Sequence, residues 1–385
     1  MEIKEVQTAS DIAAFHRLPF RVYRNDAHWV PHLKQDVEKV FHRKTNKLLR
    51  DGRVKRWLLW DKGEAIGRIA AFVNPKYAKS MKQPTGGLGF FECVEDKRAA
   101  FLLFDTAIDY LKGEGMEAVD GPINFGEKDR FWGLQIMNFE AMPSYAMNYN
   151  PEYYVRFFEE YGFNRYYEQL IYARDIYVPA QEIFVRKYNQ VMSDPAYRIA
   201  NVRGRSVEQI AYDFMTVYNN AWGGFHGFKP MPQAQALRII KAMKPVLDPD
   251  IVVFVYYNEQ PIAFYVNIPE LNEIFRHVNG NLNLWGKLVF LYHKLRKTPR
   301  TMVGMVFGVD RAFHGKGVEG AMIKWTELHI VSLNRYDHTI MTWIGDFNPK
   351  MLKVVENLGA TVYRKLATYR YVFDRSKPFE RMPIV

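Results

Sequence analysis

The chain has 385 residues, of which 48% are hydrophobic and 15% aromatic, and a formal net charge of +11. This length and apolar content are enough for packed cores and indicate two domains rather than one. Because Cys93 is the single cysteine, an intramolecular disulfide and a cysteine-based zinc site are excluded. The sequence contains no apolar stretch of about 18 residues without a charge, so no membrane-spanning helix is predicted.

The positive charge favours an acidic partner, which could be nucleic acid, an anionic membrane surface or a polyphosphate cofactor. The sequence has no zinc finger, basic-region helix or RNP-type strand, so we expect no nucleic acid. Residues 1–20 contain no apolar signal region, and we therefore expect a cytoplasmic protein. Cys93 lies in the apolar run 88–93, which favours a buried structural thiol over a nucleophile.

The chain repeats itself at an offset of about 197 residues. Residues 3–6 (IKEV) correspond to 199–202 (IANV), and each copy continues with a Val-Tyr pair and then a tryptophan, Trp29 or Trp222. A hairpin pattern follows in both copies, at 57–73 and at 252–266, because apolar runs flank a polar turn.

Later in each copy the pattern predicts a strand, a helix (97–113 or 318–335) and another strand (117–121 or 338–344). A capped helix then begins at Asn-Pro, since asparagine is a good N-cap and proline suits the first helical position.

These capped helices are expected to begin at Asn150-Pro151 and Asn348-Pro349 and to end at Gly162 and Gly359. A final strand closes each copy, at 165–173 in the first and 361–372 in the second. The repeated unit is therefore an α/β (α+β) unit with a mixed sheet.

A glycine-rich loop links the strand candidate 301–309 to the second copy of the helix. The loop is His314-Gly315-Lys316-Gly317-Val318, and Glu319 and Gly320 follow it. Such a loop is typical of a pyrophosphate cradle, because glycines admit the phosphates and free N–H groups at the helix start stabilise their charge. Arg311 and Lys316 are expected to add charge-assisted contacts.

Three kinds of phosphate loop compete for this segment. A Walker loop is excluded because its Gly-x4-Gly-Lys-Ser/Thr pattern is absent. Residues 315–320 match the Rossmann pattern Gly-x-Gly-x-x-Gly, but five residues separate them from the strand and a hairpin precedes it. The third is the acyl-CoA loop Gln/Arg-x-x-Gly-x-Gly/Ala of GNAT acyltransferases, with His314 first and Gly317 fourth. The simplest alternative is a tight turn that caps a helix.

Both halves resemble the GNAT superfamily, and the whole chain resembles the tandem-GNAT family of bacterial ceramide synthases. The segments that carry the resemblance are 30–33 (VPHL), 67–71 (GRIAA), 89–92 (GFFE), 120–122 (DGP), 150–153 (NPEY), 314–317 (HGKG), 343–348 (WIGDFN) and 369–371 (YRY). The resemblance implies two tandem GNAT-like units, each a mostly antiparallel sheet flanked by helices. It also implies N-acylation of a long-chain, sphingoid-type amino lipid by an acyl-CoA. We expect no metal, and the alternative to a freely cytoplasmic protein is peripheral contact with the cytoplasmic face of the inner membrane.

We assign residues 1–190 to a degenerate first unit, 197–373 to the acyltransferase unit and 374–385 to a C-terminal tail. In the first unit Glu95 and Asp96 stand where the loop should be, without a glycine, and two carboxylates would repel pyrophosphate. The second unit departs from the family pattern at Glu319, which replaces a small residue, and at Val355, where a general-acid tyrosine is usual.

The resemblance implies roles for further residues of the second unit. Acyl-CoA is expected to contact the loop, and a backbone N–H near Val309 is expected to stabilise the oxyanion. The residues expected to bind acyl-CoA are Val309, Arg311, His314, Gly315, Lys316, Gly317, Val318, Glu319 and Gly320. Asp346 is the first candidate base, or else a neighbour of a helix cap; Asn348 either caps its helix or contacts the pantetheine arm.

His226, on the loop 222–228, is the second candidate base, although an ordinary loop histidine is the alternative. Loops at this place usually line the acceptor pocket, so Trp222, Phe225 and Phe228 are expected to contact the amine.

Residues 282–300 are a basic amphipathic segment where a GNAT unit normally has a short turn. Apolar residues recur at helical spacing: Leu284, Trp285, Leu288, Leu291, Tyr292 and Leu295. Basic residues occupy the remaining surface: Lys287, His293, Lys294, Arg296, Lys297 and Arg300. The favoured interpretation is that the stripe packs against the other unit, and the alternative is contact with an anionic membrane.

Three functions remain open at this point. The first is N-acylation of a sphingoid-type base, the second is acetylation of a small or peptidyl amine by a GNAT enzyme, and the third is an inactive acyl-CoA-binding scaffold. The missing tyrosine favours the third, and the length of the acyl chain separates the first two.

Overall fold

A computed structural model describes residues 1–126, 128–224 and 228–384. The elements of the first half are β1 (Glu2–Glu5), α1 (Ala9–Val22), α2 (Lys34–Phe41), β2 (Arg53–Asp61), β3 (Glu64–Val73), α3 (Pro75–Ser80), β4 (Thr85–Cys93), α4 (Lys97–Gly113), β5 (Ala118–Gly121), β6 (Leu134–Met137), α5 (Tyr153–Tyr161), β7 (Asn164–Asp175) and α6 (Glu182–Met192). Short 3-10 turns occupy Lys47–Arg50, Pro249–Ile251 and Arg311–Phe313.

The second half repeats most of this order after α6. Its elements are β8 (Tyr197–Asn201), α7 (Val207–Trp222), α8 (Gln233–Met243), β9 (Val252–Tyr257), β10 (Gln260–Pro269), α9 (Asn272–Phe275), α10 (Leu284–Leu295), β11 (Thr301–Val309), α11 (Val318–Leu333), β12 (His338–Gly345), α12 (Pro349–Asn357) and β13 (Thr361–Val372). Here α9 and α10 take the place of α3, and α12 follows β12 directly, whereas β6 lies between β5 and α5. Residues 374–384 contain no helix or strand. The predicted fold class, a mixed and mostly antiparallel sheet flanked by helices in two tandem units, is confirmed.

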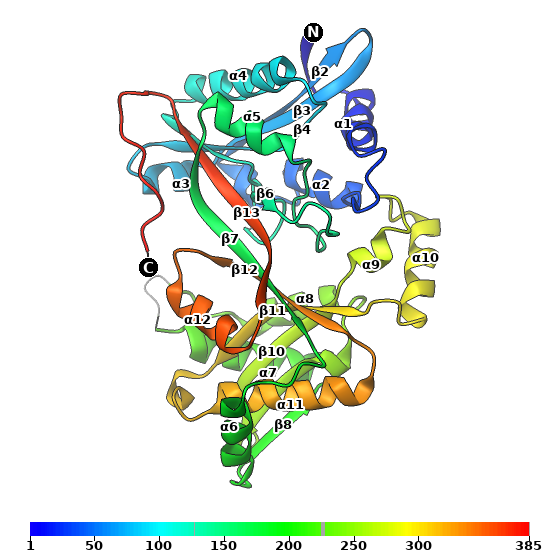
Figure 1. The fold of residues 1–385 in the computed structure, drawn as a ribbon, viewed down its shortest axis with the longest axis vertical. Helices are drawn as coiled ribbons and strands as arrows, with labels where there is room; N and C mark the ends of the chain where they lie inside the picture. Colours follow the sequence, from blue (N-terminus) through cyan, green and yellow to red (C-terminus); the bar gives the residue numbers. More distant parts are fainter. Residues whose placement is uncertain (127, 225–227, 385) are drawn as a thin grey trace.

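All strands join one sheet that runs through both units (Figure 1). Its order is β1-β2-β3-β4-β5-β13-β7-β12-β11-β10-β9-β8, with β6 paired to β13. Among the strands of the described residues, β4–β5 and β11–β12 are the only parallel pairs. Helices cover both faces of each half of the sheet: α4 and α5 lie opposite α1 and α2 in the first unit, and α6 and α11 lie opposite α7 and α8 in the second.

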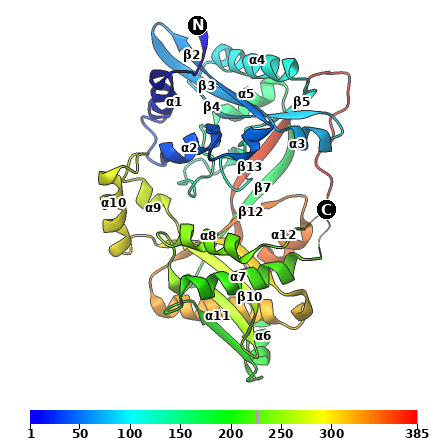
Figure 2. The same ribbon diagram turned by 180° about the vertical axis from the view of Figure 1, so that it is seen from behind.

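The two units exchange their last strands. The strand β13 ends the second unit in the chain but pairs with β5 of the first, and β7 ends the first unit but pairs with β12 of the second. The two exchanged strands also pair with each other along most of their length, and they run side by side through the middle of the molecule in Figures 1 and 2. Each unit therefore completes its sheet with a strand from the other.

A buried ion pair holds one exchanged strand in place. The Arg370 guanidinium on β13 donates two hydrogen bonds to the Asp120 carboxylate on β5, at 2.6 and 2.8 Å. Both side chains are buried, and the Tyr77 hydroxyl donates a further bond of 2.9 Å to the same carboxylate. Burial alone would lower the pKa of Arg370, but the hydrogen bonds to Asp120 and its negative charge raise this pKa by more, so the pair stays charged.

The second capped helix is as predicted, whereas the first differs. Asn348 caps α12 by accepting the N–H of Met351 at 3.3 Å, with Pro349 as the first helical residue. Asn150 is instead buried and bonds to the backbone of Gln135, so α5 begins three residues later with no side-chain cap. The prediction that Asn150 caps its helix is wrong, because β6 needs that side chain as a partner.

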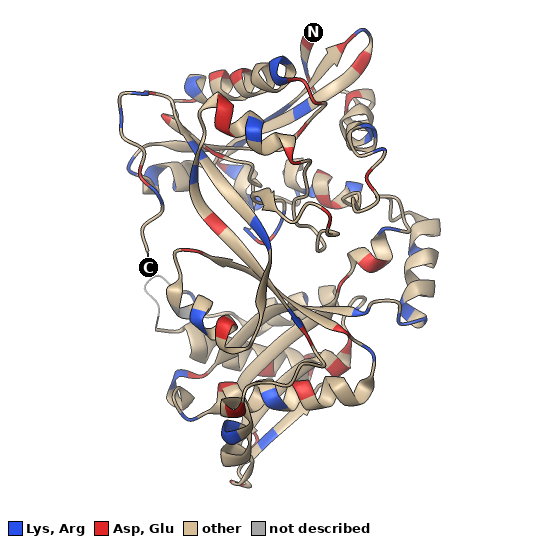
Figure 3. Cartoon of the chain, viewed as in Figure 1, with Lys and Arg blue, Asp and Glu red and all other residues tan. Residues whose placement is uncertain are grey.

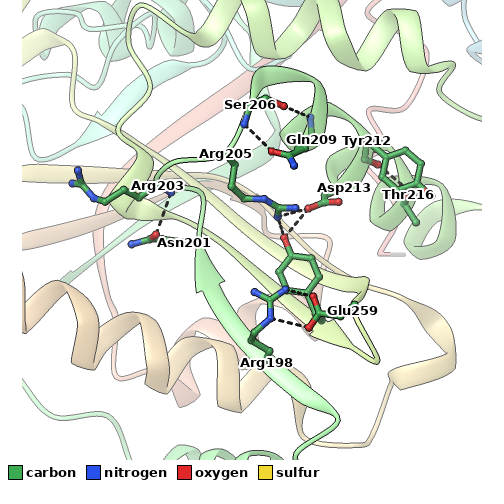
Figure 4. Close-up of polar contacts among 11 residues, drawn as sticks. Arg198, Asn201, Arg203, Arg205, Ser206, Gln209, Tyr212, Asp213, Thr216 and Glu259 are labelled. Carbon is green, nitrogen blue, oxygen red and sulfur yellow. Dashed lines mark hydrogen bonds and ion pairs between the residues drawn. The ribbon is translucent and has the colours of Figure 1, made fainter.

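The start of the second unit is built from side chains that bond locally (Figure 4). Ser206 and Gln209 form a capping box at the N-terminus of α7. The Arg205 guanidinium lies 2.5 Å from the Asp213 carboxylate, about two turns into the helix, and the Tyr256 hydroxyl donates to the same carboxylate at 2.6 Å. These contacts fix α7 on the sheet, which positions Trp222 at its other end.

Cys93 is buried, and burial raises the pKa of its thiol, as expected of a structural cysteine. Among the described residues, no helix combines the length and the apolarity that crossing a bilayer would require.

Candidate active site

The central feature of the site is a parallel strand pair that opens partway along its length. The strands β11 and β12 pair from Thr301 to Gly304 and from His338 to Met341, but both strands continue beyond this point. The Thr342 hydroxyl donates to the Gly304 carbonyl at 2.9 Å, which closes the vertex of the opening. Beyond the vertex, the edges of the two strands that face each other are free to bind a ligand.

A cavity of about 490 Å³ lies in this opening, between the strands and the helices α11 and α12. Its lining is mostly apolar and includes Met305, Ile323, Met341, Ile344, Met351 and Val354. The polar groups on it are few: Tyr265, Thr326, Glu327, Thr339, Thr342 and Asn348, together with Arg174 from the exchanged strand β7. Pockets of this size and composition are typical of small-molecule sites.

One backbone N–H group of β11, that of Val309, points into the opening between β11 and β12. The N–H of Asp310 donates to the Ile262 carbonyl on β10 at 2.8 Å. Because successive N–H groups of a strand point to opposite sides, the N–H of Val309 faces the β12 side. The Val309 carbonyl also points away from β10, where it accepts the Nε2 of His314 at 3.1 Å.

The glycine loop leads into α11, and the residue at its N-cap position, Gly317, has no side chain that could cap the helix. Gly317 occupies the N-cap position with a φ of 84°, in the left-handed region that favours glycine, and Gly315 has a φ of 75°. In the part of the chain that the structure describes, no side chain bonds to the first turn from this cap position. The N–H groups and the helix dipole therefore remain available for an anion. His314, Gly315 and Lys316 are exposed beside them, and the Lys316 ammonium lies over the Phe313 ring.

The helix α6, which joins the two units, supports this helix start. The aliphatic part of Lys187 lies against Gly317 and Gly320, and a Cβ at Gly320 would stand 2.5 Å from the Lys187 Cδ. Gly320 therefore allows the close approach of α6. The ammonium of Lys187 ends two bonds beyond Cδ, within reach of the first turn of α11. The sequence analysis did not single out Lys187, because it lies on the connecting helix α6, which carries no recognisable motif.

Arg311 makes a different contact from the one its position suggested. Its Nε donates to the Asn220 carbonyl at 3.1 Å, and its guanidinium lies against Gly224, at the end of α7. Trp222 lies flat against β11 over Gly308 and stacks with Tyr218. The Phe228 ring lies 5.8 Å from the Tyr218 ring, so Trp222 and Phe228 share one aromatic cluster on the α7 side of the sheet.

Two of the residues expected in the acceptor loop, Phe225 and His226, lie outside the described residues.

The structure separates the two candidates next to β12. Asn348 caps α12, one of the two expected roles, and also lines the cavity. The Asp346 carboxylate instead bonds to Arg381 of the tail at 2.5 Å and is absent from the cavity lining. Asp346 is partly exposed, and its N–H donates to the Glu168 carbonyl on β7. In this arrangement Asp346 reaches the opening only if its bond to Arg381 breaks.

A tyrosine that the sequence analysis did not single out lines the cavity. A Cβ built on Gly304, at the vertex, would lie 3.2 Å from the Tyr265 hydroxyl. Burial raises the pKa of Tyr265 above its ordinary value, so the hydroxyl keeps its proton. Val355 lines the same cavity and offers no proton. The alternating side-chain directions along β10 place Tyr265 on the face of the sheet that α11 covers. The sequence pattern does not show that this face borders the opening between β11 and β12.

In the first unit, the corresponding strands β4 and β5 do not separate. After the pairs Thr85–Ala118 to Gly87–Asp120, the N–H of Ile123 donates to the Leu88 carbonyl at 2.7 Å. A Cβ at Gly89 would stand 1.9 Å from the Ile123 carbonyl oxygen, so two backbones touch where the second unit has its opening.

The helix that follows β4 is also capped internally. The Asp96 carboxylate accepts the N–H groups of Arg98 and Ala99 at 2.8 and 3.3 Å. The Asp96 carboxylate therefore lies at the N-terminus of α4 and bonds to N–H groups that an anionic ligand would need.

Within the described ranges, no three His, Cys, Asp or Glu side chains come together in a way that could hold a metal ion.

No family model matches the chain. The chain is 26% identical over 385 residues to the bacterial ceramide synthase of Caulobacter vibrioides, a match that covers 96% of this chain and 97% of that protein.

Two solved structures share the fold. The tandem GNAT protein from the clavulanic acid biosynthesis pathway superposes with a TM-score of 0.53 at 9% identity, over 98% of this chain and 100% of that one. The glucosamine N-acetyltransferase region of a fungal multi-domain β-N-acetylglucosaminidase gives a TM-score of 0.54 at 12% identity, over 96% of this chain and 38% of that one. The chain therefore has a tandem GNAT fold and resembles a bacterial ceramide synthase along nearly its whole length, which confirms the resemblance predicted from the sequence.

Proposed function

We propose that this chain is an acyl-CoA-dependent N-acyltransferase that transfers an acyl group to a primary amine. The observation that carries the proposal is the opening between β11 and β12, which forms an apolar cavity within a unit that also offers an uncapped helix N-terminus. An acyl-CoA has both an apolar arm and a pyrophosphate, and the second unit offers a complement to each.

The pyrophosphate would bind at the first turn of α11, at residues 314–320. Lys316 and Lys187 supply positive charge at or near this turn, and Glu319 at the second helical position is the one carboxylate in the loop. The pantetheine and acyl groups would enter the apolar cavity. The N–H of Val309 would donate to the thioester oxygen as negative charge develops there.

For the acceptor, we propose a long-chain amino lipid of the sphingoid type. The support is the similarity along nearly the whole chain to a protein named bacterial ceramide synthase. Trp222 and Phe228 form an aromatic cluster on the α7 side of β11, opposite the α11 face, and an apolar acceptor would contact such a surface.

The reaction requires two proton transfers. The neutral amine attacks the thioester carbonyl carbon, a base removes one N–H proton, and the C–S bond breaks to release CoA thiolate. We propose Tyr265 as the group that protonates the thiolate, because its hydroxyl lies at the vertex of the opening. Asp346 and His226 remain the proposed bases.

The test is an assay of free CoA release by the purified full chain. Acyl-CoAs of increasing length are combined with sphinganine or with small and peptidyl amines. Turnover that requires a long acyl chain and sphinganine supports the proposal. Turnover only with acetyl-CoA and a small amine would assign an acetyltransferase, and binding of acyl-CoA without any release would assign a scaffold.

The roles of the proposed groups are tested by Asp346→Asn and Tyr265→Phe. We expect each to lower kcat at least about tenfold while acyl-CoA affinity stays unchanged, because each removes one proton transfer. Arg381→Gln is the control, since it removes the partner of Asp346 and leaves the carboxylate. If Asp346→Asn turns over like the unaltered chain, Asp346 is not the base.

A further inference from the structure

The helix α10 exposes an apolar face that nothing in the fold covers. Leu284, Trp285 and Leu295 are 77%, 72% and 73% exposed. Leu288, Leu291 and Tyr292 are about half exposed and continue the same stripe. The expectation that this stripe packs against the other unit is wrong, because it points into solvent. A contiguous apolar surface of this kind marks an interaction site.

A second apolar face of the same helix makes the packing contacts. Val289 and Phe290 face inward, and the Phe290 ring stacks on Phe275 of α9 at 5.7 Å. Gly286 is buried, since its Cα lies close to the Asn281 carbonyl. The inward face is therefore sufficient to attach α10, and the outward stripe is not needed for folding.

The segment is also strongly basic. Residues 274–309 contain no Asp or Glu, and residues 284–300 contain Lys287, Lys294, Arg296, Lys297 and Arg300. In Figure 3 the helix α10 carries blue and no red. Arg300 pairs with Asp337, whereas Lys287, Arg296 and Lys297 are exposed and have no acidic partner in the described part of the chain. The exposed stripe is thus surrounded by uncompensated positive charge.

The helix is held firmly at the margin of the molecule. The N–H of Lys34 in the first unit donates to the Gly280 carbonyl at 2.9 Å, and the N–H of Arg300 donates to the Glu273 carboxylate at 2.6 Å. Both Figures 1 and 2 place α10 at the outer edge, beside the junction of the two units. The stripe is therefore presented by a fixed helix with both units behind it.

We infer that α10 docks the protein onto the surface of an anionic lipid bilayer. The leucines and Trp285 would enter the boundary between headgroups and acyl chains, where Trp and Tyr side chains are favoured. The lysines and arginines would face the anionic headgroups. A second copy of the chain is a poorer occupant, because it would bring the same uncompensated cations together. This inference stands independently of the proposed acyl transfer, since it rests on α10 alone.

The test is co-sedimentation of the full chain with vesicles, without acyl-CoA. We expect binding to phosphatidylcholine vesicles that contain phosphatidylglycerol, weaker binding at high salt and little binding to pure phosphatidylcholine. Replacing Trp285, Leu288 and Leu291 by Ser should weaken binding about tenfold for each side chain. Replacing Lys287 and Lys297 by Gln should weaken it about fivefold for each charge. A double variant Tyr212→Ser and Leu328→Ser, which removes exposed apolar side chains on α7 and α11, should bind like the unaltered chain.

Thermal unfolding confirms that each variant is folded, which is expected because all these side chains are exposed. Absence of binding to anionic vesicles at low salt, or full binding by the Trp285, Leu288 and Leu291 variant, would overturn the inference. A dimer in light scattering that this variant dissociates, without vesicle binding, would assign the stripe to a second copy instead. None of these outcomes depends on turnover, so they are distinguishable from failure of the proposed function.

Discussion

In the first unit the helix after the fourth strand is capped by Asp96, whereas its counterpart in the second unit starts at Gly317. The first helix thus has a permanent anion at its N-terminus, while the second keeps its N–H groups for a ligand. The same contrast holds for the neighbouring strands, since Ile123 closes the β4–β5 pair and the β11–β12 pair opens at Gly304. The two copies of the unit therefore differ in a few local features, which close the strand pair in the first and leave it open in the second.

The largest expected effect concerns the strand exchange that joins these two units. Asp120→Asn leaves the buried Arg370 guanidinium without its carboxylate, and breaking such a pair costs about 3–5 kcal/mol. Because β13 belongs to both units, we expect one cooperative unfolding transition at lower denaturant concentration. Denaturant unfolding followed by circular dichroism measures this.

Glu117→Gln is the matched control for Asp120→Asn. Glu117 pairs with Lys377 near the same strand but is about half exposed, and such pairs contribute less than about 1 kcal/mol. Two separate transitions in the Asp120 variant, with the second unit unaffected, would contradict the idea that the exchanged strands couple the units.

The aspartate that caps α4 can also be introduced at the N-cap position of α11. Gly317→Asp places a carboxylate at the N-cap of α11, where it would accept the free N–H groups and repel pyrophosphate. We expect acyl-CoA affinity to fall about a hundredfold, which corresponds to about 2.7 kcal/mol. Titration calorimetry with a non-hydrolysable acyl-CoA analogue measures the change.

Gly317→Asn separates charge from backbone strain in that experiment. Asparagine has the shape of aspartate, tolerates a positive φ comparably and can also cap the helix, so its effect reports strain and capping without the negative charge. Equal losses for Asp and Asn would show that phosphate charge is not recognised at this helix start.

The converse change, Asp96→Ala, has a smaller expected effect. It removes the cap of α4 at a cost of about 1 kcal/mol. We expect no acyl-CoA site to appear in the first unit, because the contact between Ile123 and Leu88 still closes the strands. Calorimetry should give one acyl-CoA per chain; a stoichiometry of two would show that the cap alone inactivates this unit.

The smallest expected effect concerns α9 and α10, which lie between β10 and β11, whereas only the short α3 lies between β3 and β4. The rings of His277 and His293 stack at 4.2 Å between these helices, and burial, His293 and Arg276 lower the pKa of His277. A lowered pKa means that the folded state favours neutral His277, so this stabilisation is present above about pH 6.5 and is lost as the pH falls.

We expect amide hydrogen exchange in α10 to rise about two- to fivefold between neutral pH and pH 5, after correction for the intrinsic rate. His277→Gln should remove this excess. An unchanged profile in that variant would assign the acid response to another group.

The repeat explains why so much of the fold followed from the sequence. Two copies with the same hairpins and glycine stops predict the same elements twice, and the structure contains them. The glycine loop was also recognisable, because few other structures need glycines at both 315 and 317.

Contacts across the repeat were not predictable in the same way. The sequence pattern of β13 is equally compatible with a strand that pairs inside the second unit. Only its observed pairing with β5 shows that the strand is exchanged. No motif marks Lys187 on α6, and Tyr265 belongs to the predicted hairpin 252–266, whose pattern does not indicate a catalytic role. The helix α10 is apolar on two faces, so its periodicity could not indicate which face would be buried.

The exchanged strand also constrains the order of events during synthesis. The first unit emerges from the ribosome without β13, so the edge of β5 stays unpaired until residues 361–372 have been made. Contacts between residues about 250 positions apart are slow to form, and unpaired strand edges promote aggregation in the meantime. We therefore expect that neither unit folds when it is produced alone, and that the duplicated chain behaves as a single unit of folding.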